Sequence, residues 1–149
     1  MNQGRFQDEN KTISEFRINV LVVCPKCGKK AFARVEYENK SARLFCESCG
    51  YNKVTSTQAT VFGDSGNWQL SADSYFGAEL WLKASFKSNV FWAYNLSHLE
   101  YLEKYISANL REHKGRTHFT LLEKLPKFYH EAKNREALLK IIERLKSLL

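Results

Sequence analysis

The sequence has no apolar run that approaches the roughly 20 residues required by a membrane-spanning helix. Its first 16 residues, MNQGRFQDENKTISEF, are polar and lack the apolar h-region of a secretory signal. These absences argue against a membrane partner and against export. We therefore expect a cytoplasmic protein whose thiols are reduced.

Recognised catalytic patterns are also missing. The chain has no glycine-rich phosphate loop, no serine nucleophile elbow and no His-Glu-x-x-His helix. Paired carboxylates have no recognisable setting, and the histidines are dispersed over expected helices and a loop, where surface or capping roles are expected: His98, His113, His118 and His130. We expect a protein that is not an enzyme.

What the sequence does contain is enough apolar material for a packed core and an excess of positive charge. Of 149 residues, 44% are hydrophobic and 13% aromatic, which suits one domain or two small lobes. The formal net charge is +7, with Lys and Arg in excess in residues 1–60 and 101–149 and Asp and Glu in excess in residues 61–100. A basic balance of this kind favours polyanionic partners.

All four cysteines lie in two Cys-x-x-Cys pairs, Cys24/Cys27 and Cys46/Cys49, separated by 18 residues. In a reducing compartment this spacing predicts a four-cysteine zinc site rather than disulfides. Gly28 directly follows the first pair and Gly50 the second, where positive φ would let backbone N–H groups turn towards the thiolates. Four thiolates close the coordination sphere, so the expected role is structural rather than catalytic.

Two other interpretations of the cysteines remain open. Iron in a rubredoxin-like site uses the same four ligands, and spacing does not distinguish it from zinc. A redox Cys-x-x-Cys normally occurs singly at a strand-to-helix junction, whereas this chain has two matched pairs.

The stretch around the cysteines is typical of a small antiparallel sheet. KAFARVEYEN at 30–39 alternates apolar and polar residues, NKS at 39–41 predicts a turn, and ARLFC at 42–46 returns to the second pair. YNKVTSTQATVF at 51–62 is rich in β-branched residues and predicts a further strand. With these knuckles and strands, residues 18–57 resemble the transcription-factor-type zinc ribbons.

The remainder predicts a hairpin followed by helices. FGDSGNW at 62–68 indicates a turn or linker, and AELWLKASFKSNVFWAYN at 78–95 a β-hairpin that turns at Ser88-Asn89. A capping box at 97–100 predicts a helix through residue 112, ended at 114–116. Two short helical pieces are expected around Pro126, and Asn134 is expected to cap a final helix whose apolar arc contains Leu138, Ile141, Ile142, Leu145, Leu148 and Leu149.

The predicted fold class is therefore α+β, with an N-terminal four-cysteine zinc ribbon, a β-hairpin and C-terminal helices. The expected domains are an N-terminal segment at 1–17, the ribbon at 18–60 and a hairpin-plus-helices lobe at 61–149. YFGAELWL, WAYNLSHLEYLEKYISANLRE and LPKFYHEAKNREALLKIIERL resemble segments of an uncharacterised group of bacterial proteins that carry such a ribbon. The resemblance covers about residues 18–149, implies a cytoplasmic bacterial protein and transfers no activity.

Two kinds of partner suit this sequence. Nucleic acid, either RNA or DNA, would be bound by cations of the ribbon that contact phosphates, namely Lys29, Lys30, Arg34, Lys40, Arg43 and Lys53. Unpaired bases could stack on Phe32, Tyr37, Phe45 or Tyr51. The plainer alternative is that these rings cover the small core of the ribbon and the cations are only solvated.

The alternative function is that of an adaptor in a larger protein complex. It would dock through the edge of the ribbon and through the amphipathic C-terminal helix. The sequence leaves the oligomeric state open.

Overall fold

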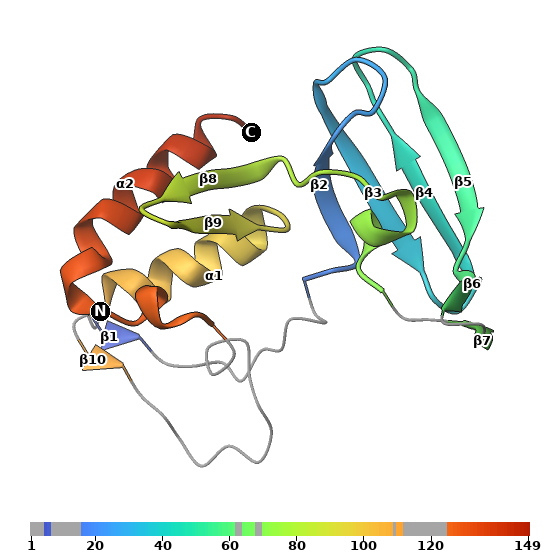
Figure 1. Cartoon of the computed structure of the whole chain (residues 1–149). Helices are drawn as coiled ribbons and strands as arrows, with labels where there is room; N and C mark the ends of the chain where they lie inside the picture. The colour runs from blue at the N-terminus through green and yellow to red at the C-terminus, as the bar shows by residue number, and fades with distance from the viewer. Residues whose placement is uncertain (1–4, 7–15, 62–63, 68–69, 109, 112–124) are drawn as a thin grey trace. The chain divides into compact units, whose positions relative to one another are not determined.

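The computed structural model describes residues 5–6, 16–61, 64–67, 70–108, 110–111 and 125–149 (Figure 1). The chain divides into two compact units, one of Phe16–Leu82 and one that joins Met1–Glu15 to Lys83–Leu149. The predicted α+β class is confirmed, because an antiparallel sheet with four cysteines near it precedes a hairpin and two α-helices. None of the described helices combines the length and the apolar composition that crossing a bilayer requires.

The first unit is built on a four-stranded antiparallel sheet, here called the ribbon sheet. Its strands are β2 (Asn19–Val23), β3 (Lys30–Glu36), β4 (Ser41–Phe45) and β5 (Asn52–Ser56), in the order β2-β3-β4-β5. The alternation expected at 30–39 is confirmed, and one face of the sheet buries Val20, Val22, Ala31, Ala33, Val35, Ala42 and Leu44.

A short 3-10 helix, η2 (Ala72–Phe76), contacts β2, β3 and β4. Ala72 is fully buried, and its N–H donates to the Arg17 carbonyl at 2.9 Å. Alanines on the buried face of the sheet leave room for a helix at close range. The core of this unit is therefore made largely of small side chains.

The two edges of the ribbon sheet differ. The outer edge of β2 is covered by residues 79–81, because the Val23 N–H donates to the Glu79 carbonyl and the Trp81 N–H to the Leu21 carbonyl. Among the strands that the structure describes, β4 alone pairs with β5, and Val54 on β5 is 62% exposed. The ribbon sheet thus presents one open edge.

The predicted turn or linker at 62–68 is wrong for residues 64–67. Strands β6 (Gln58–Val61) and β7 (Asp64–Asn67) pair antiparallel, with Val61 opposite Asp64. Aspartate, serine and glycine are typical of turns, but a two-residue connection lets such a segment pair with the strand before it. Residues 62, 63 and 68 lie outside the described residues.

The second unit contains the expected hairpin, β8 (Leu82–Phe86) and β9 (Asn89–Ala93). The hairpin is confirmed, but its turn lies one residue earlier than predicted, at Lys87–Ser88, and Lys87 has φ of 54°. A parallel pair, β1 (Arg5–Phe6) and β10 (Leu110–Arg111), belongs to the same unit.

Two α-helices, α1 (Leu96–Ser107) and α2 (Arg135–Lys146), pack on one another, and α1 also contacts β9. Between them in the sequence lie two 3-10 turns, η4 (Lys127–Tyr129) and η5 (Ala132–Asn134). Stacked rings join these turns to the hairpin: Phe91 with Tyr129 at 5.2 Å and Phe86 with Phe128 at 5.4 Å between centroids. This unit therefore has its own aromatic and aliphatic core.

The apolar arc predicted for the last helix is partly confirmed. Leu138, Ile141, Ile142 and Leu145 are buried. Leu148 and Leu149 lie beyond the end of α2 and are 45% and 42% exposed, so they do not continue the arc.

The start and the end of α1 differ from the prediction. Asn95 is the N-cap, and its Oδ1 accepts the His98 N–H at 2.9 Å, so the capping box expected from Ser97 to Glu100 does not form. The helix ends at Ser107, because residues 110–111 belong to β10 instead. Residues 114–116, which were expected to terminate it, lie outside the described residues.

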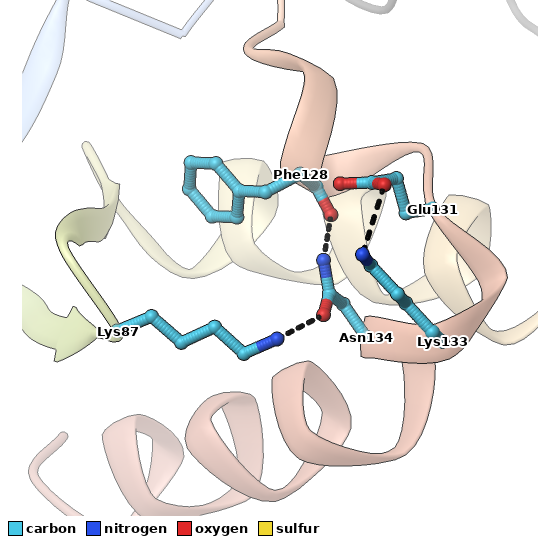
Figure 2. Close-up of polar contacts among 5 residues, drawn as sticks. All are labelled: Lys87, Phe128, Glu131, Lys133 and Asn134. Atoms are coloured by element: carbon cyan, nitrogen blue, oxygen red, sulfur yellow. Dashed lines mark hydrogen bonds and ion pairs between the residues drawn. The ribbon is translucent and has the colours of Figure 1, made fainter.

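Asn134 occupies the expected N-cap position of α2 but does not cap the helix with its side chain. Its Nδ2 donates to the Phe128 carbonyl at 3.1 Å, and its Oδ1 accepts from Lys87 Nζ at 3.0 Å (Figure 2). Asn134 is 2% exposed, so its bond to the Phe128 carbonyl is buried, whereas the bond from exposed Lys87 is partly buried. Asn134 therefore ties the hairpin turn and the segment before α2 together rather than starting the helix.

Candidate metal centre and the open face of the ribbon sheet

The two cysteine pairs form matching knuckles. The Cys24 N–H donates to the Lys29 carbonyl and the Gly28 N–H to the Cys24 carbonyl, at 2.8 and 2.9 Å. The second knuckle repeats this pattern with Cys46, Tyr51 and Gly50, both bonds at 2.9 Å. Gly28 and Gly50 have φ of 77° and 79°, which confirms the positive φ expected after each pair.

The four sulfur atoms converge on one point. They lie within 4.8 Å of one another, with Cys24 Sγ 3.7 Å from Cys49 Sγ and Cys27 Sγ 3.6 Å from Cys46 Sγ. Sulfurs bonded to a tetrahedral ion at about 2.3 Å would lie about 3.8 Å apart. A disulfide would require about 2.05 Å, and all four cysteines are free. The site is therefore positioned to hold one metal ion through sulfurs from both knuckles.

Backbone N–H groups are arranged around one of the thiols. The N–H groups of Lys26 and Cys27 lie 3.4 and 3.5 Å from Cys24 Sγ. Burial acts to raise the pKa of Cys24, but these N–H groups, together with hydrogen bonds from the Cys49 and Cys27 thiols, outweigh it and lower the pKa to about 6. The first knuckle is thus prepared to hold a thiolate, the form that ligates metal.

The pKa of Cys27 is shifted in the opposite direction. The Lys29 N–H acts to lower its pKa, but desolvation and the neighbouring sulfurs outweigh that and raise the pKa to about 11. Four thiolates at this separation repel one another. A bound cation is what would allow all four to be deprotonated together.

The face of the ribbon sheet opposite the buried one is called the open face here. The register places Arg34 opposite Arg43, and Phe32 opposite Phe45. The two phenylalanine rings are stacked, with centroids 5.3 Å apart and an angle of 23° between the ring planes. Lys30 Nζ lies 5.9 Å from the centre of the Phe32 ring. Cations and half-buried rings therefore share one surface.

One end of the open face is hollowed. A depression of about 360 Å³ is lined by Arg34, Glu36, Ser41, Arg43 and Phe45. The guanidinium carbon of Arg43 lies 5.6 Å from the Phe45 ring centre, and its Nε donates to Asn52 Oδ1 at 3.2 Å. Sequence reasoning had not singled out Glu36 or Ser41. The signal that could have found them is the strand period of two, because Glu36 follows Arg34 by two residues and Ser41 is its partner across β3 and β4.

The six cations expected to contact nucleic acid occupy different places. Lys30, Arg34 and Arg43 lie on the open face, and exposed Lys29 directly precedes β3. Lys40 lies in the turn between β3 and β4 with φ of 53°. Lys53 is opposite Leu44, which places it on the other face of the sheet.

The four aromatic residues expected to stack on unpaired bases also lie in different places. Phe32 and Phe45 are half-buried on the open face. The Tyr37 hydroxyl donates to the Leu70 carbonyl, so Tyr37 contributes to the fold of the first unit. Tyr51 accepts the Cys46 N–H with its carbonyl at the second knuckle.

Two of the histidines are described. Of the two roles expected for His98, surface or capping, the surface role is wrong because His98 is 2% exposed, whereas its Nδ1 accepts the Tyr94 N–H at 3.0 Å, a capping contact just before α1. Burial lowers the pKa of His98 to about 4. His130 is half-buried and its Nδ1 is hydrogen-bonded to the Tyr105 hydroxyl. His113 and His118 lie outside the described residues.

No protein-family model matches the chain, and no curated protein or solved structure matches it. Membership of the bacterial group named above stays a prediction.

Proposed function

We propose that this chain is a cytoplasmic, non-catalytic zinc protein that binds nucleic acid through the open face of its ribbon sheet. The observation that carries the proposal is the pair Arg34 and Arg43, opposite each other beside the stacked rings of Phe32 and Phe45. The metal supports this surface because β3 begins just after the first knuckle and β4 ends just before the second.

Zinc is the ion that best suits four sulfurs at tetrahedral spacing. Such a closed site supplies a cross-link between the two knuckles and leaves no position for a substrate. Cys24, Cys27, Cys46 and Cys49 would hold the ion. Tetrahedral four-sulfur sites also take iron, so the metal has to be identified by measurement.

Elemental analysis of protein purified from its native host is expected to give one zinc ion per chain. The reason is that four thiolates in this geometry fill the coordination sphere of a d¹⁰ ion that has no redox chemistry. One iron per chain would replace zinc with a rubredoxin-like centre, and absence of metal would contradict both.

Repulsion between the Arg34 and Arg43 side chains destabilises the sheet unless a bound anion neutralises it. Like charges directly opposite one another in an antiparallel sheet are destabilising. Among the residues that the structure describes, neither Arg34 nor Arg43 has a carboxylate within ion-pair distance. A phosphate backbone would remove that repulsion and release counterions on binding.

Affinity for a mixed-sequence single-stranded oligonucleotide is expected to fall linearly with salt on a log–log plot. Replacing Arg34 and Arg43 by glutamine should lower the affinity and reduce the slope, because each phosphate contact contributes roughly one counterion to it. The matched control replaces two exposed lysines of the second unit, Lys104 and Lys140, by glutamine. It should change neither the affinity for the oligonucleotide nor the slope of its salt dependence. Absence of binding at low salt by the wild type would refute the proposal.

The adaptor function remains the second candidate, supported by the open edge of β5. An exposed edge strand can receive a strand from a partner, and Val54 offers it an apolar side chain. The apolar face of α2 is less suited to this role, because its buried residues already pack within the second unit. Strand addition through an edge would respond weakly to salt, which separates it from nucleic-acid binding.

A further inference from the structure

The hollow of the open face is lined by cationic, aromatic and oxygen-bearing side chains, and a small inorganic ion could not contact all three kinds favourably. Arg34 and Arg43 provide guanidinium groups, Phe45 provides an aromatic ring, and Glu36 and Ser41 provide oxygen atoms. A volume of about 360 Å³ lies within the range of small-molecule sites. The ligand should therefore be anionic in one part, flat and apolar in another, and able to donate hydrogen bonds.

A ligand that consists of phosphate alone does not fit this combination. The Glu36 carboxylate would repel it, since one carboxylate oxygen already accepts only a neutral donor, Asn39 Nδ2, at 2.6 Å. A bare polyanion would also make no use of the Phe45 ring as a stacking surface. The mixed lining of the hollow therefore restricts the ligand more than a surface of cations alone would.

Duplex nucleic acid does not fit either. In a duplex the base faces are covered by neighbouring bases, so an aromatic ring on a sheet has nothing to stack on. An unpaired base presents its face to a ring and its edge to polar side chains. The Phe45 ring is held in place by stacking on Phe32, so it would act as a fixed platform.

We propose that the hollow is a subsite for one unpaired nucleotide of a single-stranded nucleic acid, a selectivity that rests on the proposed function. The base stacks on Phe45, a phosphate binds Arg34 and Arg43 in the next cross-strand row, and Glu36 and Ser41 in the row beyond accept hydrogen bonds from hydroxyl or N–H donors of the ligand. Because the Nε of Arg43 is used by Asn52, its terminal nitrogens are the donors that remain for a phosphate. Stacking and charge thus come from one side of one sheet.

The test compares three ligands on the holo protein: a single-stranded oligonucleotide, the same strand in a blunt duplex, and a strand of equal length with abasic sites throughout. The single strand should bind at least about five-fold more tightly than the other two, which is the lower end of the contribution of one stacked base. Replacing Phe45 by leucine should lower affinity for the single strand by a similar factor and leave affinity for the abasic strand unchanged.

The outcomes separate the two proposals. Equal affinity for all three ligands would overturn the nucleotide subsite and leave general nucleic-acid binding standing, whereas no binding to any of them would overturn both. Leu21 lies opposite Phe32 on the same face, so Leu21→Ala serves as a control for loss of apolar surface outside the hollow. If Leu21→Ala weakened single-strand binding as much as Phe45→Leu, a stacking role specific to Phe45 would be refuted. Thermal unfolding of both variants shows whether either change acts through the fold.

Discussion

Replacing Cys27 by serine is expected to unfold the ribbon sheet while the second unit remains folded. Structural zinc contributes an apparent ~10–16 kcal/mol in small finger peptides, as much as the whole stability of many domains. The buried face of the ribbon sheet consists of valines, alanines and one leucine, too little apolar surface to replace that contribution. Amide hydrogen exchange should show protection lost in β3 and β4 and kept in α1 and α2.

The control for this experiment is Ser48→Ala. Ser48 is exposed in the second knuckle, between Glu47 and Cys49, and offers no sulfur to the metal site. It should leave metal content and protection unchanged. If the Cys27→Ser protein kept native protection in β3 and β4 without metal, the metal would not hold the ribbon sheet together.

The ribbon could be predicted from its sequence because its signals are local. The two Cys-x-x-Cys pairs, the glycine after each and the period of two in β3 all act within a few residues. Each of these features has the same physical cause in the structure as in the prediction: sulfur geometry, positive φ and burial of one face. The convergence of the four sulfurs follows from them.

The composition of the open face was harder to predict, because it depends on register. Lys53 and Arg43 are similar as residues, but the pairing of Lys53 with Leu44 and of Arg43 with Arg34 places them on opposite faces. A list of basic residues cannot make this distinction, since a shift of one position moves every side chain to the other face. Glu36 and Ser41 were missed for the same reason.

Caps and helix ends were mispredicted where two local signals compete. Ser97 and Glu100 satisfy the capping-box pattern. Asn95, two residues after the end of β9, is an equally good N-cap residue. Asn134 has the right residue type for a cap, yet its side chain bonds to Lys87 and Phe128 instead. The first case is decided by the local bond between Asn95 and His98, and the second by the contact of Asn134 with the distant Lys87, which propensity alone does not contain.

The second unit is expected to lose stability as the pH falls from about 6.5 to about 4, because of His98. Its Nδ1 accepts the Tyr94 N–H, so the neutral ring carries its proton on Nε2, and a second proton would face a donor. Burial lowers its pKa in the folded state to about 4, against about 6.5 when unfolded. The unfolded state therefore binds more protons in this window, and unfolding is favoured there.

The expected loss is about 3 kcal/mol between those two pH values, with no further change from His98 below about 4. The measurement is the exchange-derived free energy of opening at α1 amides, which follows this unit separately from acid release of the metal. His98→Asn keeps an acceptor near the Tyr94 N–H but cannot titrate. The variant should be less stable at neutral pH because it fills less of the core. Its stability should nevertheless depend less on pH between 6.5 and 4. His130 and the carboxylates titrate in both proteins, so the difference in pH dependence between them reports on His98. Identical pH dependence in the two proteins would show that His98 does not titrate on unfolding in this range.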